Sequence, residues 1–360
     1  MYIKSLKLKN FRNYESLDID LDKSVNIFHG DNAQGKTNVL EAIYYASTSK
    51  SHKGSKEKEI VRFGEEDSHI KMIVSKNGLD ERIDIHLKKN KKKGIAINGI
   101  PIKKSSELLG IVNVIIFSPE DLNIIKNGPS ERRRFIDLEL CQLDKIYLYN
   151  LVSYNKILNQ RNKLLKEISF SQNESLMSTI ELWDIQLSKF GREIIIQRRK
   201  FIEKINQILK GIHCKLSGGK ENIIIKYEPD CDENELEKAL TDSRSRDLKY
   251  KFTSVGPHKD DLGFFLNDID IRKFGSQGQQ RTAALSLKLS EIELVKEMLN
   301  DNPVLLLDDV LSELDVNRQN HLLNTLGDIQ TLITCTGVDE FVRNRFNINK
   351  TFEVINGVIK

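Results

Sequence analysis

Cysteine, proline and long apolar runs are all scarce in this 360-residue chain, and each scarcity excludes a class of protein. The four cysteines are scattered without CxxC or metal-type spacing, so a disulfide framework or a zinc site is not expected. The longest apolar runs, such as residues 111–117 and 304–307, are far shorter than the roughly 20 residues that cross a bilayer. Lys4 and Lys7 interrupt the first residues, so no secretory leader is expected either. These absences predict a cytoplasmic protein without a membrane span.

Proline is also absent between Pro129 and Pro229, and this stretch predicts two long helices. Apolar residues mark one seam along each helix: Ile136, Leu140, Leu143, Tyr147, Leu151, Tyr154 and Leu158 in the first, and Ile180, Leu187, Ile194, Phe201 and Ile208, seven residues apart, in the second, with Trp183 and Phe190 between them. A polar turn at 170–175 separates the seams and predicts an antiparallel hairpin about 50 Å long. A helical subdomain packed flat on the rest of the chain is the alternative.

Short strands and helices alternate on both sides of this hairpin, which predicts an α/β fold. Strands are expected at 69–74, 81–88 and 111–117, and after residue 230 in "PVLLLDDV", "TLITC" and "TFEVI". We therefore predict an ATPase head formed by residues 1–128 and 231–360, into which a helical arm, residues 129–230, is inserted.

Residues 30–37, "GDNAQGKT", match the P-loop pattern G-x-x-x-x-G-K-[ST] between a predicted strand and a predicted helix. Its glycines allow backbone N–H groups to turn inward towards phosphate oxygens, and the helix adds its positive N-terminal end. Lys36 is expected to reach the β- and γ-phosphates of ATP, and Thr37 to hold Mg²⁺. The predicted nucleotide contacts are Gly30, Asp31, Asn32, Ala33, Gln34, Gly35, Lys36, Thr37 and Asn38.

The apolar strand "VLLL" ends in Asp308 and Asp309, as a Walker B strand does. Asp308 is expected at the metal site, where its carboxylate reaches the second shell of the metal beside the P-loop strand, and Asp309 is expected to orient the attacking water or act as general base. "SELD" at 312–315 follows directly and matches a D-loop, which lies along a dimer interface in such ATPases.

Two segments compete for the signature loop of an ATP-binding cassette, and the loop must open a helix to present a serine and backbone amides to a γ-phosphate. "LSGGK", with Ser217, precedes the strand-like "IIIKY" and carries two glycines that suit a helix end. "SQGQQRT" precedes a helix with Leu285, Leu289, Ile292, Val295 and Leu299 on one face. We therefore assign the signature to Ser276, Gly278 and Gln279, which predicts that Ser276 meets the nucleotide of a second copy in an ATP-dependent homodimer.

Seven segments spread over the whole chain together resemble the RecF proteins of bacterial recombinational repair, relatives of SMC and other cassette-type ATPases. They are "LKNFRNYESLDIDL", "GDNAQGKTN", "FSPEDL", "GPSERRRFID", "GPHKDDL", "SQGQQRTAALSLKL" and "LLLDDVLSELD". The resemblance implies an ATP-dependent DNA-binding protein that acts at gapped or junction DNA with the RecO and RecR proteins to help load the RecA recombinase. It also implies a weak, DNA-stimulated ATPase that works as a switch.

Two positions depart from the transporter-type cassette. A switch histidine is expected after "TLITC", where the chain has Thr334 and Thr336, and the loop Ser118–Asp121 contains no glutamine. Both departures count against a transport ATPase, and helices of about 40 residues are too short for a structural chromosome-organising SMC head with its long arms.

The net charge of +4 is mild, so the position of the basic residues matters more than their sum. Three clusters could contact DNA: residues 50–58, residues 88–94 and Arg132–Arg134. The lysines at 88–94 could also be simply solvated, and the arginines could form internal ion pairs. None of the clusters has interleaved aromatic residues, which favours contacts to the backbone of duplex or junction DNA. His258 could approach the nucleotide or serve a structural role.

Overall fold

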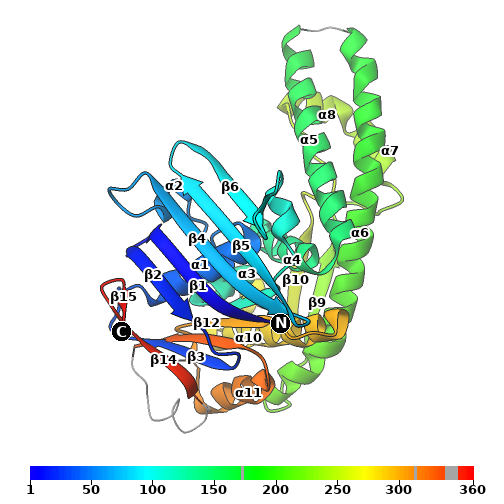
Figure 1. The fold of residues 1–360 in the computed structure, drawn as a ribbon. Coiled ribbons are helices and arrows are strands. Elements are labelled where there is room, and N and C mark those ends of the chain that lie inside the picture. Colours follow the sequence, from blue (N-terminus) through cyan, green and yellow to red (C-terminus); the bar gives the residue numbers. More distant parts are fainter. Residues whose placement is uncertain (172–173, 312–313, 337–347) are drawn as a thin grey trace. The chain divides into compact units, whose positions relative to one another are not determined.

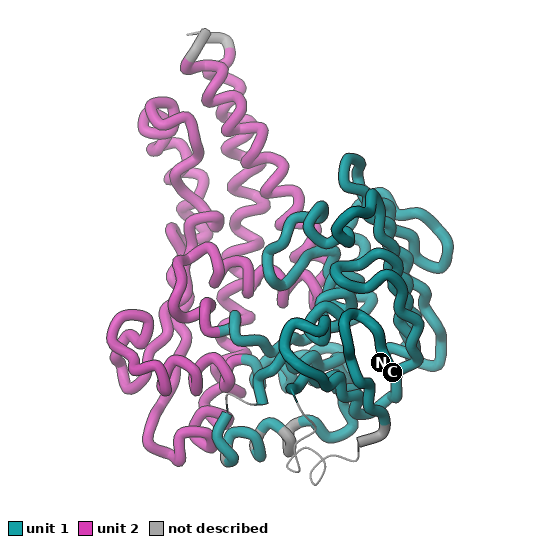
Figure 2. Tube along the Cα trace, turned by 90° about the vertical axis from the view of Figure 1, so that its left-hand side faces the viewer, with its two compact units in different colours: residues 1–121, 288–360 teal, residues 122–287 magenta. Residues whose placement is uncertain are grey.

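The computed structural model describes the backbone of residues 1–171, 174–311, 314–336 and 348–360. The chain divides into two compact units, coloured separately in Figure 2: unit 1 consists of Met1–Asp121 and Lys288–Lys360, and unit 2 of Leu122–Leu287. The predicted arm, residues 129–230, falls within unit 2, which continues to Leu287. No helix among the described residues is long and apolar enough to cross a membrane.

Unit 1 contains an antiparallel sheet of six strands in the order β2-β1-β4-β5-β6-β7 (Figure 1). Its strands are β1 (Tyr2–Phe11), β2 (Tyr14–Asp20), β4 (Asp67–Lys76), β5 (Leu79–Lys88), β6 (Lys91–Ile97) and β7 (Ile100–Pro101). Buried and more exposed residues alternate along β5, where Ile83, Ile85 and Leu87 are buried. This alternation is typical of a sheet with one face packed on a core.

The second sheet of unit 1 has the order β15-β14-β3-β13-β12-β8. β3 (Val25–His29), β8 (Val114–Phe117), β12 (Val304–Asp308), β13 (Thr331–Cys335) and β14 (Ile348–Ile355) are parallel, and β15 (Val358–Ile359) is an antiparallel edge strand. β12 is buried along its whole length, as strands of parallel sheets are. The strand that ends in Asp308, β12, does not pair with the P-loop strand β3, because β13 pairs with both and lies between them.

The P-loop helix α1 (Lys36–Thr48) contacts strands of both sheets in unit 1. Every residue from Val39 to Thr48 is buried, so the helix is enclosed on all sides. A helix enclosed in this way must pair its charged side chains internally. The remaining short elements of the unit are α2 (Glu57–Ile60), η1 (Ser105–Leu108), η2 (Pro119–Asp121) and α11 (Val316–Leu326).

Unit 2 is mainly helical, with a three-stranded antiparallel sheet in the order β11-β10-β9. The helices are α3 (Leu122–Lys126), α4 (Pro129–Leu143), α5 (Lys145–Ser171), α6 (Glu174–Leu216), α7 (Leu236–Asp242), α8 (Arg244–Tyr250) and α9 (Ile271–Phe274), and the strands are β9 (Ile223–Glu228), β10 (Asp261–Leu266) and β11 (Ile269–Asp270). A further helix, α10 (Gln277–Leu299), begins in unit 2 and ends in unit 1. Nearly every residue from Thr282 to Val295 is buried, so α10 also has more than the one buried face that its sequence predicts.

The prediction of two long helices after Pro129 was wrong, because the first is broken into α4 and α5 at Asp144. Asp144 has an extended backbone, and its carboxylate accepts a hydrogen bond from the N–H of Ile146 at 2.7 Å. An Asp side chain that satisfies a free N–H in this way starts a new helix, which residue spacing alone does not reveal.

The second predicted seam holds for part of α6. Ile180, Leu187, Ile194 and Phe201 are buried, whereas Ile208 is only partly buried and its neighbour Leu209 is fully buried. An α-helix drifts about 20° per heptad relative to a strict seven-residue repeat, so the buried stripe moves to an adjacent residue after several turns. Residues 172 and 173 of the predicted turn lie outside the described residues.

Candidate nucleotide site

The P-loop of unit 1 connects β3 to α1 and has the backbone that its glycines predict. Gly30 has φ 146° and Gly35 has φ 116°, conformations that residues with a Cβ rarely adopt. A Cβ on Gly30 would collide with the carbonyl of Val354, and one on Gly35 would lie 2.5 Å from the amide of Asn13. Both positions therefore require glycine, while Asp31, Asn32 and Ala33 are exposed at the tip of the loop.

Lys36 and Thr37 lie at the start of α1 below this loop. The Lys36 ammonium is buried and donates hydrogen bonds to the carbonyls of Gly30 and Asp31, both at 2.8 Å. The Thr37 hydroxyl donates to the Asp308 carboxylate at 2.7 Å. The structure thus brings the predicted P-loop and Walker B groups together, although 271 residues separate them in sequence.

Asp308 is held by two hydroxyl groups at the end of β12. Besides Thr37, the buried Thr334 of β13 donates to its Oδ1 at 2.9 Å, and Thr334 also accepts the backbone N–H of Asp309 at 2.9 Å. Burial raises the pKa of Asp308, and the hydrogen bonds from Thr37 and Thr334 act in the opposite direction. Thr334, which stands near the position expected for a switch histidine, therefore orients Asp308 and Asp309.

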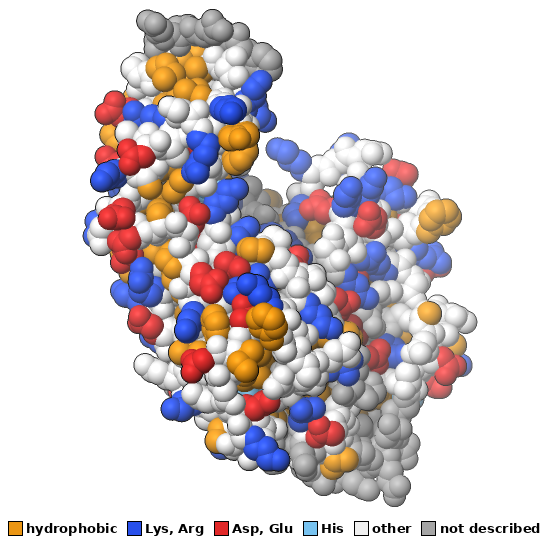
Figure 3. All heavy atoms as spheres, turned by 180° about the vertical axis from the view of Figure 1, so that it is seen from behind, with side chains coloured by type: hydrophobic (Ala, Val, Ile, Leu, Met, Phe, Trp, Pro, Cys, Tyr) orange, Lys and Arg blue, Asp and Glu red, His pale blue; other side chains and the backbone are white. Residues whose placement is uncertain are grey.

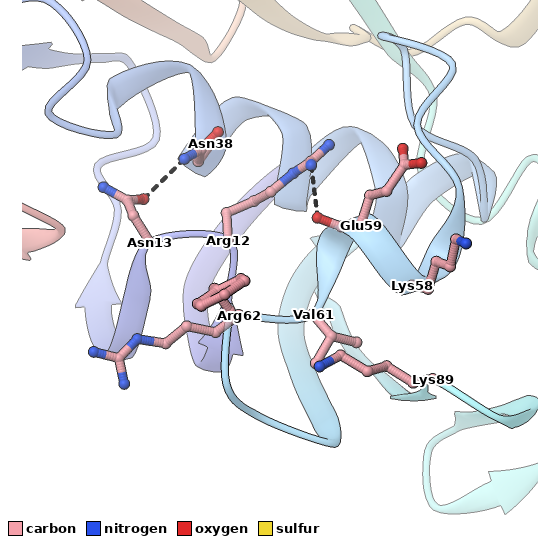
Figure 4. Close-up of a pocket in the computed structure, with 9 residues that line it drawn as sticks. Arg12, Asn13, Asn38, Lys58, Glu59, Val61, Arg62 and Lys89 are labelled. Carbon is pink, nitrogen blue, oxygen red and sulfur yellow. Dashed lines mark hydrogen bonds between the residues drawn. The ribbon is translucent and has the colours of Figure 1, made fainter.

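Side chains outside the predicted motifs brace the P-loop. The Asn13 amide donates to the carbonyl of Gln34 at 2.8 Å. It also accepts from the amide of Asn38 at 2.8 Å (Figure 4). The turn between β14 and β15 contacts Gln34 as well, because the N–H of Asn356 donates to the Gln34 side chain at 2.6 Å and that of Gly357 to the Gln34 carbonyl at 3.0 Å. Asn13, Asn356 and Gly357 were not predicted as part of the site, although Asn13 stands in the quoted segment "LKNFRNYESLDIDL".

A hollow of about 810 Å³ opens in unit 1 next to this brace (Figure 4). It is lined by Arg12, Asn13, Asn38, Lys58, Glu59, Val61, Arg62, Phe63 and Lys89. The Phe63 side chain is fully exposed, and the cations around the hollow outnumber its single carboxylate. Amides and cations beside a P-loop suit the polar edge of a nucleotide base, and an aromatic ring suits the flat face of that base.

Arg12 lines the hollow, and its guanidinium also pairs with a buried carboxylate of α1. Its guanidinium makes a bidentate pair with the fully buried Glu41 of α1 at 2.8 and 2.6 Å and also donates to the Ser55 hydroxyl and to the carbonyl of Glu59. Burial raises the pKa of Glu41, but the hydrogen bonds from Arg12 and Ser51 hold the pKa below its usual value overall. The carboxylate is therefore charged inside the unit.

The loop 118–121 contains no glutamine, so a metal contact from this loop would have to come from Glu120 or Asp121. Asp121 turns inward and accepts the N–H of Ser118 at 2.8 Å, and burial raises the pKa of Asp121 to about 6. Glu120 is exposed, which leaves it as the carboxylate of this loop that is free to reach a metal. Among the described residues no group of three or more His, Cys, Asp or Glu could hold a metal, as is usual for Mg²⁺ sites that rely on phosphate oxygens and water.

The two competing signature segments both lie in unit 2, and only one of them opens a helix. The Ser276 hydroxyl accepts the N–H of Gln279 at 3.2 Å, and the Gln279 side chain accepts the N–H of Ser276 at 3.0 Å, so the pair caps α10. Ser276 and Gly278 are exposed there. The other segment ends α6, where the N–H of Gly219 donates to the carbonyl of Cys214 at 2.8 Å.

The segment around Ser217 nevertheless supports the signature loop. The Glu221 carboxylate accepts a hydrogen bond from the Gln279 side chain at 2.9 Å and contacts His213 at 3.3 Å. The predicted D-loop cannot be compared, because Ser312 and Glu313 lie outside the described residues. Asp315 caps α11 by accepting the N–H of Arg318 at 3.0 Å.

The three basic clusters differ in their partners. Arg132 is buried and pairs with Asp261, so the internal ion pair is the correct alternative for it.

His258 is structural, because its ring nitrogens contact the Tyr154 hydroxyl at 2.7 Å and the carbonyl of Thr253 at 3.0 Å. On the face seen in Figure 3, basic and acidic side chains are interspersed along the long helices of unit 2 without a field of one sign.

The other two basic clusters meet in unit 1. Lys93 of β6 pairs with Glu57 of α2 at 2.6 Å and donates to the carbonyl of Ser49 at 2.9 Å, which ties residues 88–93 to residues 49–57. The Lys93 ammonium therefore has intramolecular partners in unit 1. The exposed lysines of both clusters have no ion pair among the described residues: Lys50, Lys53, Lys56, Lys58, Lys88, Lys91 and Lys92.

Comparison with known proteins agrees with this geometry. The family model described as "RecF/RecN/SMC N terminal domain" matches residues 2–360. A protein of Lachnospira eligens named DNA replication and repair protein RecF is 67% identical over 357 residues, 99% of this chain and 98% of its own. A protein of the same name from Agathobacter rectalis is 62% identical over 360 residues, 100% of this chain and 99% of its own.

Solved structures extend the likeness to the fold. A structure described as the recombination mediator protein RecF-ATP in the RecFOR pathway has a TM-score of 0.93 at 38% identity, with 100% of this chain and 97% of that chain covered. An SMC head domain from Pyrococcus furiosus has a TM-score of 0.57 at 17% identity, with 100% and 95% covered, and this likeness concerns the fold alone. The predicted cassette-type ATPase fold is confirmed.

Proposed function

Because this chain belongs to the RecF family of SMC-type ATPases, we propose that it is an ATP-dependent DNA-binding protein of recombinational repair. It binds Mg²⁺-ATP, dimerises on it at gapped or junction DNA, and helps load the RecA recombinase together with RecO and RecR. Such work on chromosomal DNA belongs to the cytoplasm. The contact between Thr37 and Asp308 is the observation that carries this proposal, because it unites the two halves of an ATP site.

The ATP site would use the P-loop residues for the phosphates and two side chains for the metal. The Thr37 hydroxyl and the Asp308 carboxylate are the oxygen ligands that Mg²⁺ prefers, and they already face each other at 2.7 Å. Lys36 would leave the carbonyls of Gly30 and Asp31 and neutralise the β- and γ-phosphates. Mg²⁺ would supply electrostatic stabilisation of the transferred phosphoryl group, and Asp309 would orient the attacking water.

Dimerisation would come from the exposed signature loop of unit 2. Ser276 and Gly278 stand at the start of a helix of 23 residues, where free N–H groups and the helix dipole favour an anion. ATP would stabilise the dimer through contacts between its γ-phosphate and Ser276 of a second copy, and ADP lacks that phosphate. Slow hydrolysis of ATP would therefore act as a switch, because the dimer would dissociate once the γ-phosphate is lost.

DNA would contact the joined lysine clusters of unit 1. The exposed lysines of residues 50–58 and 88–92 carry charges that no acidic side chain of the described residues neutralises at close range. Contacts of lysine with phosphate are independent of base sequence and weaken as salt displaces them. A dimer would double this surface, which makes DNA affinity depend on ATP.

Sedimentation of Ser276→Arg and Ser217→Arg with ATP and a gapped duplex tests the proposal. Ser276→Arg should abolish ATP-induced dimers and ATP-dependent DNA binding while the monomer keeps its affinity for ATP. Ser217→Arg is the matched control, because it places the same bulk in the segment that ends α6. A Ser276→Arg protein that still dimerises, or a Ser217→Arg protein that does not, would contradict the assignment.

The DNA surface has its own test. Lys91→Ala with Lys92→Ala should weaken ATP-dependent binding of all duplex sequences alike, and the slope of log affinity against log salt should fall by about 1–2 because up to two phosphate contacts are lost. Lys156→Ala with Lys200→Ala, two exposed lysines of unit 2, is the control. An equal loss of DNA affinity in both double variants would contradict the assignment of the DNA-binding surface to unit 1.

A further inference from the structure

Both ring nitrogens of His52 are shielded from solvent, and neither has a hydrogen-bond partner in the described structure. Buried polar groups are almost always paired, because an unpaired one loses its hydrogen bonds to water without replacing them. Here a single side chain leaves a donor and an acceptor unsatisfied together. Such a group indicates a ligand or a second state of the protein in which the imidazole finds partners.

The backbone returns His52 along the P-loop helix. α1 ends at Thr48, Ser49 adopts a left-handed conformation, and the Ser51 hydroxyl donates to the Glu41 carboxylate at 2.5 Å. The ring of His52 then lies edge-on to that of Tyr44, with centroids 5.6 Å apart and planes at 78°. The segment 49–52 therefore runs back from the end of α1 towards its beginning.

The face of α1 that residues 49–52 contact also carries Thr37, a residue of the phosphate site. Thr37, Glu41 and Tyr44 follow one another at spacings of four and three residues, so they share one face of the helix. Thr37 is the residue whose hydroxyl contacts Asp308. His52 thus sits over the same face as the predicted metal ligand, about two turns along.

Electrostatics independently connects His52 with the Walker B carboxylate. Burial lowers the pKa of His52, while the charges of Glu41, Asp308 and Glu120 raise it, and the net direction is downward. The charges of Lys53 and His52 act in turn on the pKa of Asp308. The imidazole is neutral at pH 7, so one nitrogen donates a hydrogen bond and the other accepts one.

We propose that His52 is a further contact residue for the terminal phosphate of ATP: its N–H donates to a phosphoryl oxygen, and its other nitrogen accepts from a water bound to that phosphate. The proposal rests on the ATP site proposed above. It gives this chain an imidazole at the γ-phosphate from the segment after α1, whereas β13 carries Thr334 near the position expected for a switch histidine.

The contact also couples the nucleotide to DNA. Since neither nitrogen is accessible in the described structure, a phosphate reaches His52 only if residues 50–56 shift. The same segment carries the exposed Lys50, Lys53 and Lys56. ATP therefore repositions part of the proposed DNA surface, and ADP, which lacks the terminal phosphate, leaves it in place.

His52→Phe tests the contact, because a phenyl ring keeps the packing against Tyr44 and removes both nitrogens. We expect the variant to fold at least as stably as the wild type, to bind ADP normally, and to lose about tenfold in its preference for a non-hydrolysable ATP analogue over ADP. His52→Gln, which retains a donor and an acceptor, should recover part of that preference. His69→Phe, a histidine of β4 that pairs with Asp84, is the control.

A wild-type preference in His52→Phe overturns the proposal, and so does an equal loss in His69→Phe. Hydrogen exchange of the wild type gives a second measurement that needs no variant. Amides 50–56 should change their protection with the ATP analogue but not with ADP, and identical protection in both states refutes the coupling. Unchanged ATP affinity in Lys36→Ala would instead refute the ATP site itself, which separates the two failures.

Discussion

Replacing Arg12 by alanine should destabilise unit 1 more than any change to a surface charge. The Glu41 side chain has no exposed area, and Arg12 holds it with two hydrogen bonds of 2.8 and 2.6 Å. Without the guanidinium, only the Ser51 hydroxyl remains on a carboxylate enclosed between two sheets. Removing one partner of a buried ion pair costs about 3–5 kcal/mol of unfolding free energy, because the remaining charge is left uncompensated.

The loss should depend on pH. In the folded wild type the pKa of Glu41 is lowered, so the pair contributes stability above the unfolded pKa and loses it as pH falls through the folded pKa. Arg12→Ala lacks this contribution, and the difference between the two proteins should therefore shrink in acid. An Arg12→Met, Glu41→Leu double variant should recover most of the loss, since apolar side chains fill the same space without a charge.

The assay must report on unit 1. The single tryptophan, Trp183, lies in unit 2, so its fluorescence reports the unfolding of unit 2 and not of unit 1. Hydrogen exchange of the buried α1 amides at increasing urea measures the opening of unit 1 directly. Lys7→Ala is the control, because its pair with Asp18 at 2.7 Å is 49% and 64% exposed and is screened by water. A loss in Arg12→Ala no larger than in Lys7→Ala would refute the reasoning.

Three further outcomes are expected. Lys36→Ala should weaken ATP binding, measured by titration with a fluorescent analogue, because the loop loses its buried cation beside the phosphates. Turnover of the wild type should fall well below the roughly 1–100 s⁻¹ of kinases, because Asp309 holds water less closely than a longer Glu, and Asp309→Asn should accumulate the ATP-bound form; rapid turnover or no accumulation would contradict this. The raised pKa of Asp121, from 3.8 to about 6, means that the folded state binds its proton more tightly, so stability should fall by up to about 3 kcal/mol between pH 4 and pH 6. Asp121→Asn should remove that slope in urea unfolding, and an unchanged slope would assign it to another group.

Local features of this protein could be predicted from sequence because their geometry is set within a few residues. Gly30 and Gly35 are needed for the left-handed backbone of an eight-residue loop, and the pattern of the loop records that need. Ser276 and Gln279 cap α10 through contacts three residues apart, and paired glycines end α6 after Ser217. Local rules therefore separated the two signature segments correctly. The role of Ser276 at a nucleotide stays a prediction.

Strand order and the bracing of the site could not be predicted in the same way. β13 lies between the P-loop strand and the Walker B strand because parallel strands are ordered by their crossover connections, which leave no mark in the strands themselves. Asn13 reaches Gln34 across 21 residues and Thr334 reaches Asp308 across 26, and neither pair follows a repeat. Long-range contacts of this kind depend on the packing of the sheets around α1.

Charged residues show most clearly what only the tertiary structure decides. Arg132, Lys93 and Lys92 all stand in basic runs that look equivalent in sequence. Arg132 pairs with Asp261, 129 residues away, Lys93 pairs with Glu57, and Lys92 is exposed. The sequence determines how many charges each run carries, because composition is local. Which of them water or DNA can reach depends on where the fold places an opposite charge, because a buried charge must be paired and an exposed one need not be.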